Sequence, residues 1–347
     1  MRFTSPSILL LAAIEHAAAI RFLGRVNPET RQLTWPGTGV SFTFTGSSAT
    51  IELSALTGTN SAQLTIDGVE TVLSSVSGTS ITTPSNLRHG NHTVELRKRS
   101  EASFGTITIG SITTDGIIGP DAVSDRKMQI IGDSITVGYG LDGDYPCVNT
   151  AAVENNPKTY GALAASALGA DYDIIAWSGI GLIRNFASNQ DTGDIMPQRW
   201  TRYGALDPLA SYTFPEAATP DVVVINLGTN DFGYSEGVRG PIVPAEYTDG
   251  MVNFVSKIKS HYPDAAFFLL TSPMLNDGWP STQDAQKTTQ RNALMAAIEQ
   301  LGNSTTVQLV DIPSQGSDVG CDYHPNAATH AAEAEILAKA VAEEMGW

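Results

Sequence analysis

Three short motifs carry the side chains that acyl transfer requires. Ser134 ends the motif Gly132-Asp-Ser134, which directly follows an apolar run. Asn230 ends the motif Gly228-Thr-Asn230, and His324 lies in a loop rich in Gly, Asp, Pro and Asn. A serine hydroxyl becomes a nucleophile when a base removes its proton, and an amide N–H stabilises the oxyanion that then forms. A serine, an amide and a histidine in this order therefore indicate an esterase-type site.

His324 is the best candidate for the base. It lies between the last predicted strand and the last predicted helix, where a loop can bring it to Ser134. The other histidines lie in the N-terminal segment, in contexts typical of turns or solvated faces, or inside a predicted helix: His16, His89, His92, His261 and His330. A lone histidine is more often an inert surface or core residue. The pairing of its loop with the Ser134 motif favours catalysis for His324.

Three groups can donate hydrogen bonds to an oxyanion. The backbone N–H of Ser134 lies where a helix can begin, and such N–H groups have no partner within the helix. Gly179 follows a predicted strand, and without a side chain its N–H can approach a substrate closely. The third donor is the side-chain amide of Asn230. Taken singly, Gly179 can also be a strand-to-helix turn and Asn230 a turn residue or helix cap.

The elements that must position these residues alternate along the second part of the chain. Apolar runs predict strands over residues 127–131, 172–177, 221–227, 265–270 and 307–310. Helical patterns lie between and after them, over residues 158–168, 245–261, 282–301 and 327–344. Such alternation predicts a parallel sheet with helices on both faces. In these sheets, reactive groups gather beyond the carboxyl ends of the strands, where Ser134, Gly179 and Asn230 lie.

The first part of the chain has a different pattern. Residues 20–118 are rich in Thr, Ser, Gly and Val, and polar and apolar residues alternate over 40–45, 49–53, 63–66 and 92–97. Short strands separated by regular turns predict a small antiparallel sandwich or jelly roll. We therefore expect a β-sandwich domain over residues 20–120 and a catalytic domain over residues 121–347, with residues 117–121 as the connector.

Residues 1–19 are typical of a secretory signal peptide. Arg2 supplies a positive charge, an apolar run covers residues 7–14, and Ala17-Ala-Ala19 offers small residues for cleavage. The apolar run is too short to span a bilayer. This pattern predicts a secreted, extracellular protein.

Secretion affects the expectation for the two cysteines, Cys147 and Cys321. They can be two free buried thiols, but in an oxidising compartment we expect one disulfide. Such a bond would tie the loop after Ser134 to the loop that carries His324. Two sequons, at Asn91 and Asn303, are predicted glycosylation sites.

Composition narrows the range of partners. The net charge is -16, which argues against a nucleic-acid partner and against an anionic membrane surface. The sequence contains no metal-ligand spacing, phosphate loop or dinucleotide fingerprint, so we expect no metal and no cofactor. The oligomeric state does not follow from the sequence.

Four motifs together resemble a known superfamily. Gly132-Asp-Ser134, Gly179, Gly228-Thr-Asn230 and His324 are similar, in order, to the four blocks of the SGNH (GDSL-like) hydrolases. The resemblance covers about residues 127–347. It implies an SGNH-type three-layer α/β sandwich with a mainly parallel sheet. It also implies that Ser134 is the nucleophile, that His324 is the base, and that Ser134, Gly179 and Asn230 form the oxyanion hole.

Together with the β-rich N-terminal domain, this layout resembles carbohydrate esterase family two, the acetyl xylan esterases. That resemblance implies a secreted serine esterase that removes O-acetyl groups from plant cell-wall polysaccharides through an acetyl-enzyme. Its partner would be an acetylated polysaccharide or oligosaccharide. Two alternatives stay open: a general or lipolytic carboxylesterase of the superfamily, and a catalytically silent glycan-binding protein.

One position departs from the superfamily pattern. An aspartate usually lies three residues before the histidine, but Cys321 occupies that position here, and Asp322 is one residue closer. We therefore expect a Ser134–His324 dyad in which a backbone carbonyl orients the imidazole, with Asp322 as an alternative third member. Trp279 lies in a loop after an apolar strand, where it can either stack on a sugar ring or pack against the protein.

Overall fold

The computed structural model describes residues 20–186, 193–234, 239–302 and 305–347. The predicted signal peptide, residues 1–19, lies outside the described residues. So does Asn303, one of the two predicted glycosylation sites. The other, Asn91, is exposed at the start of strand β8.

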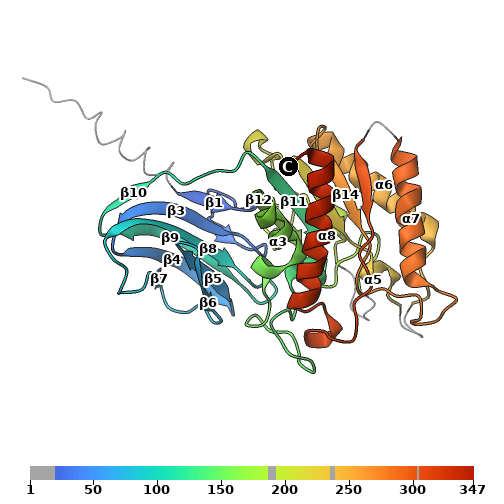
Figure 1. Cartoon of the computed structure of the whole chain (residues 1–347), viewed down its shortest axis with the longest axis horizontal. Coiled ribbons are helices and arrows are strands. Elements are labelled where there is room, and N and C mark those ends of the chain that lie inside the picture. The colour runs from blue at the N-terminus through green and yellow to red at the C-terminus, as the bar shows by residue number, and fades with distance from the viewer. Residues whose placement is uncertain (1–19, 187–192, 235–238, 303–304) are drawn as a thin grey trace, which may run out of the picture.

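The N-terminal part is an antiparallel β sandwich, as predicted (Figure 1). One sheet has the strand order β1-β3-β8-β5-β6, with β10 also paired to β3, and the other has the order β2-β9-β4-β7. The strands are β1 (Arg21–Leu23), β2 (Gln32–Leu33), β3 (Gly39–Gly46), β4 (Ala49–Gly58), β5 (Ala62–Ile66), β6 (Val69–Leu73), β7 (Ser80–Thr82), β8 (Gly90–Lys98), β9 (Gly105–Thr114) and β10 (Ile117–Gly119).

Alternation within the strands builds the core of this sandwich. In β3, Val40, Phe42 and Phe44 are buried, and in β8 Val94 and Leu96 meet them from the neighbouring strand. Successive side chains of a strand point to opposite faces, so each strand contributes every second residue to the space between the sheets. The apolar residues of both sheets form one cluster.

The C-terminal part is an α/β domain built on a five-stranded parallel sheet with the order β12-β11-β13-β14-β15. Its strands are β11 (Lys127–Gly132), β12 (Asp171–Ala176), β13 (Val222–Asn226), β14 (Ala266–Leu270) and β15 (Val307–Val310). Its α-helices are α2 (Ser134–Val137), α3 (Tyr160–Ala167), α4 (Met196–Arg199), α5 (Thr229–Phe232), α6 (Pro244–His261), α7 (Gln286–Leu301) and α8 (Ala327–Met345). Three short 3-10 turns are η1 (Asn156–Lys158), η2 (Glu216–Ala218) and η4 (Cys321–Tyr323).

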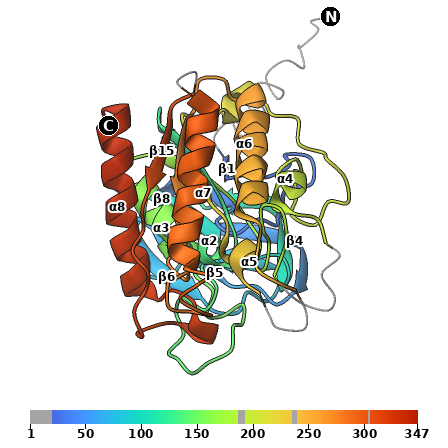
Figure 2. The ribbon, with the colours of Figure 1, turned by 90° about the vertical axis from the view of Figure 1, so that its right-hand side faces the viewer.

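Helices cover both faces of this sheet, which confirms the predicted three-layer fold. Val222 and Val224 of β13 pack in the cluster that includes α3 and α8. Val223 and Ile225 pack in the cluster that includes α6 and α7. Strand β13 is therefore buried on both sides, which explains its continuous apolar run. Figure 2 shows α6 and α7 side by side, with α8 on the other side of β15.

The two domains share a core. Trp35 and Ala102 belong to the β sandwich by sequence, yet both are buried in the α6 and α7 cluster of the α/β domain. The indole N–H of Trp35 donates to the carbonyl oxygen of Tyr203 at 2.8 Å. The guanidinium of Arg25 donates to the carbonyl oxygens of Trp200 and Arg202. These contacts are buried and include both apolar packing and hydrogen bonds. The β sandwich therefore stabilises the α/β domain directly.

One difference from the sequence predictions concerns the surroundings of the sheet. Helix α7 begins at Gln286 rather than at residue 282, so the residues before it extend the loop that carries Trp279. None of the helices within the described ranges is both long and apolar enough to span a membrane.

Candidate active site

The carboxyl edge of the parallel sheet gathers the predicted site residues. Ser134 begins α2 just after β11, Gly179 follows β12, and Asn230 lies in α5 just after β13. Strand β11 lies between β12 and β13, so the two strands that follow it in sequence lie on opposite sides of it. Ligands of open α/β sheets bind at such a switch point. His324 approaches the same edge from the connection between β15 and α8.

Ser134 and His324 are in direct contact. The Oγ of Ser134 and the Nε2 of His324 lie 2.8 Å apart. The Nδ1 of His324 lies 3.2 Å from the backbone carbonyl oxygen of Asp322, and a carbonyl can only accept. Nδ1 therefore carries the proton in this hydrogen bond, which leaves Nε2 free to accept the proton of the serine.

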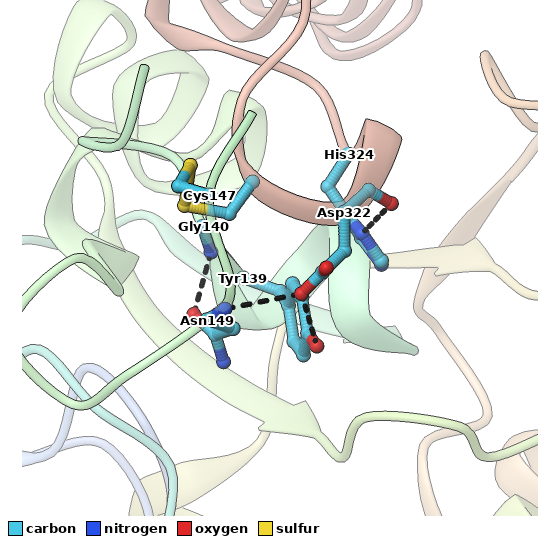
Figure 3. The surroundings of a disulfide bond; sticks show 7 residues. Tyr139, Gly140, Cys147, Asn149, Asp322 and His324 are labelled. Atoms are coloured by element: carbon cyan, nitrogen blue, oxygen red, sulfur yellow. Dashed lines mark hydrogen bonds between the residues drawn. A yellow bond between two sulfur atoms is a disulfide. The ribbon is translucent and has the colours of Figure 1, made fainter. Parts of the chain in front are cut away.

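The Asp322 carboxylate points away from the imidazole (Figure 3). Its Oδ2 accepts the hydroxyl of Tyr139 and the backbone N–H of Asn149, each at 3.0 Å. Asp322 has a left-handed backbone, with φ 52° and ψ 35°. The structure thus places the carbonyl of Asp322 at Nδ1 and the carboxylate in a separate hydrogen-bond network.

A disulfide ties the histidine loop to the loop after the serine. Cys147 and Cys321 form the predicted bond across a sequence separation of 174 residues. Two backbone hydrogen bonds flank it: Cys321 N–H donates to Gly140, and Asp322 N–H donates to Cys147, both at 3.1 Å. Tyr139 adds a side-chain contact, since its ring stacks on the His324 ring with centroids 4.1 Å apart.

The turn that carries Gly179 requires a glycine and is fixed by a buried aspartate. Gly179 has φ +79°, a conformation that strains other residues. Just beyond it, the Asp231 carboxylate accepts the backbone N–H groups of Leu182, Ile183 and Arg184 at 2.8 to 3.1 Å. Asp231 therefore anchors this loop.

Asn230 lines the same site. Its Nδ2 donates to the carbonyl oxygen of Ile180 at 2.7 Å and lies 3.5 Å from the Oδ2 of Asp133. The second contact is at the limit of a hydrogen bond, so one N–H remains available to an acceptor in the pocket. Asp133 caps helix α2, because its Oδ1 accepts the N–H of Ile135 at 3.0 Å. Burial raises the pKa of Asp133 to about 7.

The environment of His324 favours its neutral form. Burial lowers the pKa of its imidazole to about 4, although the carbonyl and the negative charge of Asp322 oppose this shift. Removing a ring from water penalises the charged imidazolium more than the neutral imidazole. At neutral pH the ring is therefore uncharged and can act as a base.

The other described histidines have different partners. His92 pairs with the Asp67 carboxylate at 2.7 Å, and His330 is buried in α8. His261 is exposed at the end of α6, as expected, and its ring stacks on Phe214 with centroids 3.7 Å apart. Within the described residues, no cluster of histidine, cysteine and acidic side chains has the composition of a metal site.

A pocket of about 540 Å³ opens over the serine and the histidine. The indole of Trp279 borders it and is 60% exposed. Sequence reasoning missed most of the remaining lining, which comes from several loops: Tyr139, Phe186, Tyr234, Met274, Leu275 and Gln286. Only Tyr139 had a local signal, because it lies a few residues after Ser134 in the same motif.

Two protein families match separate parts of the chain. Residues 130–332 match the GDSL-like Lipase/Acylhydrolase family, and residues 22–118 match the family described as Carbohydrate esterase 2 N-terminal. The first match spans the parallel sheet and the second spans the β sandwich.

Individual relatives agree with both matches. A crystal structure of a carbohydrate esterase family 2 enzyme with a carbohydrate binding domain, from Corynascus thermopiles (Myceliophthora fergusii), is 63% identical. It has a TM-score of 0.92 over 94% of this chain and 100% of that one. The cellulase/esterase CelE of Acetivibrio thermocellus is 32% identical over 92% of this chain, which spans only 38% of that relative's length. An acetylxylan esterase / glucomannan deacetylase of Cellvibrio japonicus is 29% identical over 92% of this chain and 87% of its own.

Asp322→Asn tests whether the carboxylate takes part in proton transfer. Asparagine tolerates the left-handed backbone and leaves the carbonyl at Nδ1 in place. We expect kcat for p-nitrophenyl acetate to fall by less than about tenfold. In a Ser-His-Asp triad the same exchange costs about 10⁴-fold. Ser134→Ala is the control and should abolish nearly all turnover; a comparable loss in Asp322→Asn would restore the triad.

The pH dependence of kcat/KM tests the neutral imidazole. Protonated His324 cannot accept the serine proton, so the rate should be lost as the pH falls through the pKa of His324. Because burial lowers this pKa to about 4, we expect the acid limb of the profile to have its midpoint near that value. A midpoint near 6.5, the ordinary value for histidine, would contradict this account.

Proposed function

The chain belongs to the GDSL-like lipase/acylhydrolase family and, with its N-terminal domain, to carbohydrate esterase family 2. On this premise we propose that it is a serine esterase that removes O-acetyl groups from plant cell-wall polysaccharides such as xylan and glucomannan. The 2.8 Å contact between Ser134 Oγ and His324 Nε2, at the floor of an open pocket, is the observation that carries this proposal. The names of its relatives support the substrate class.

The first half of the reaction forms an acetyl-enzyme. The Oγ of Ser134 attacks the acetyl carbonyl carbon while its proton passes to Nε2 of His324. The oxyanion of the tetrahedral intermediate accepts hydrogen bonds from the N–H groups of Ser134 and Gly179 and from the Asn230 amide. When the bond to the sugar oxygen breaks, that oxygen takes the proton from Nε2.

The second half releases acetate. Water attacks the acetyl-enzyme and loses its proton to His324, and the same donors hold the second oxyanion. Collapse of this intermediate expels Ser134 Oγ, which regains its proton from Nε2. The Asp322 carbonyl holds the imidazole tautomer throughout, although it stabilises imidazolium less than a carboxylate would.

The surroundings of the site suit a neutral polymer. The pocket is open, and the exposed indole of Trp279 presents an aromatic face on which a sugar ring can stack. A net charge of -16 does not hinder an uncharged polysaccharide. The disulfide between Cys147 and Cys321 requires an oxidising compartment, which supports action outside the cell.

Acetate release from acetylated xylan and glucomannan, measured in parallel with hydrolysis of p-nitrophenyl acetate, tests the proposal directly. We expect wild-type protein to act on both kinds of substrate and Ser134→Ala on neither. Activity on the small ester alone would favour a general carboxylesterase. No activity on either, together with polysaccharide binding, would favour a silent glycan-binding protein.

Trp279→Ala tests the proposed contact with the sugar. Loss of one stacking face should raise KM for acetylated xylan about fivefold, since aromatic contacts of this kind contribute about 1 kcal/mol. The kinetic constants for p-nitrophenyl acetate should stay unchanged, because this ester is too small to reach the pocket rim. Leu209→Ala is a matched control at an exposed apolar residue outside the pocket. Equal effects of Trp279→Ala on both substrates would assign the indole to packing.

A further inference from the structure

A connection in the β sandwich enters the α/β domain beneath the active site. Residues 99–104 join β8 to β9, and within this segment Ala102 packs in the core of the α/β domain. Glu101, next to it, is buried as well. Burial of a carboxyl group is unfavourable unless hydrogen bonds satisfy it, so its partners show what it does there.

The carboxylate of Glu101 holds the turn that carries Gly179. Its Oε2 accepts the backbone N–H of Ser178 at 2.9 Å. Ser178 directly precedes Gly179, the residue whose N–H is a proposed oxyanion donor. Asp231 holds the loop on the other side of Gly179. The turn is therefore fixed between two buried carboxylates, one of which comes from the β sandwich.

The backbone N–H of Glu101 starts a series of hydrogen bonds that leads to His324. Its N–H donates to Oε2 of Glu154 at 2.7 Å, and Oε1 of Glu154 accepts the side-chain amide of Asn149 at 2.7 Å. The backbone N–H of Asn149 donates to the Asp322 carboxylate at 3.0 Å, and the Asp322 carbonyl accepts from His324 (Figure 3). A continuous series of hydrogen bonds thus links Glu101 to the imidazole.

The side chain of Lys98 adds further hydrogen bonds to the segment that carries Glu101. Its Nζ donates to the carbonyl oxygens of Ser100 and Glu101, the latter at 3.0 Å. Lys98, Glu101 and Glu154 are all buried. A fully hydrogen-bonded polar group in a region of low dielectric resists displacement, because any broken bond leaves an unpaired polar atom. The geometry on both sides of Glu101 is therefore stiff.

We propose that Glu101 is a positioning residue for the esterase reaction, supplied by the β sandwich, which holds the oxyanion turn at Ser178 and the histidine loop in register with each other. This inference rests on the proposed function, since it concerns how well the same site stabilises its oxyanion. It assigns the N-terminal domain a role in turnover that does not depend on glycan binding.

Three substitutions at Glu101 test which property of its side chain matters: an oxygen acceptor within reach of Ser178, the negative charge, or packing alone. Glu101→Gln keeps an oxygen acceptor for the Ser178 N–H, and we expect its kcat on p-nitrophenyl acetate to stay within about threefold of wild type. Glu101→Ala removes the acceptor and Glu101→Asp keeps the charge but cannot reach Ser178. Both should lower kcat about 10 to 10²-fold, approaching the loss caused by removing an oxyanion donor, with KM within about twofold. Titration of the serine with a fluorophosphonate gives the concentration of intact sites for each variant.

Asn60→Ala is the matched control. Asn60 is buried in the β sandwich and donates to the carbonyl oxygens of Thr57 and Thr106, and its side chain takes no part in the series of bonds. It should lower Tm and leave kcat per titrated site unchanged. The inference fails if wild type is active and both Glu101→Ala and Glu101→Asp behave like Asn60→Ala, with a lower Tm and an unchanged kcat per titrated site. If Glu101→Ala does not fold, Glu101→Asp alone decides. Inactivity of wild type and Asn60→Ala alike would instead overturn the proposed function.

Discussion

The hydrogen bond between Ser134 Oγ and His324 Nε2 constrains the rest of the structure. Its partners lie 190 residues apart, yet their atoms are 2.8 Å from each other. A displacement of half an ångström at either end weakens such a bond considerably. Ser134 is held by β11, the strand flanked by β12 and β13. His324 follows only the short turn η4, so its position depends on contacts with other segments.

Those contacts come from the loop after Ser134 and fix the histidine loop relative to the serine. The disulfide, the stacked ring of Tyr139 and the hydrogen bonds to Asp322 all connect the histidine loop to residues 139–149. The Gly179 turn is also held by contacts from other segments, because carboxylates there accept backbone N–H groups. Part of the acidic character of this chain is therefore internal, where it fixes loops that lack regular secondary structure.

The sequence predicted the framework of the α/β domain well, for a physical reason. Strands buried on both faces must be apolar throughout, so β13 and β14 are evident from residue types alone. The orientation of the imidazole by a carbonyl was also expected, because Asp322 stands one residue too close to His324. Glu101, Asn149 and Glu154 were not predicted. Most of their hydrogen bonds join residues that are far apart in the chain, and no local pattern predicts a hydrogen bond of that range.

The shared core described for Trp35 and Ala102 bears on how such proteins are assembled. A domain that can be moved between proteins by recombination should carry a complete interior of its own, and here the α/β half does not, because Trp35 and Ala102 complete its core. The alignment with the longer Acetivibrio thermocellus relative includes 92% of this chain, so both halves occur there side by side within a larger protein. A recombination break between the sandwich and the α/β layer would separate a core from two of its own residues.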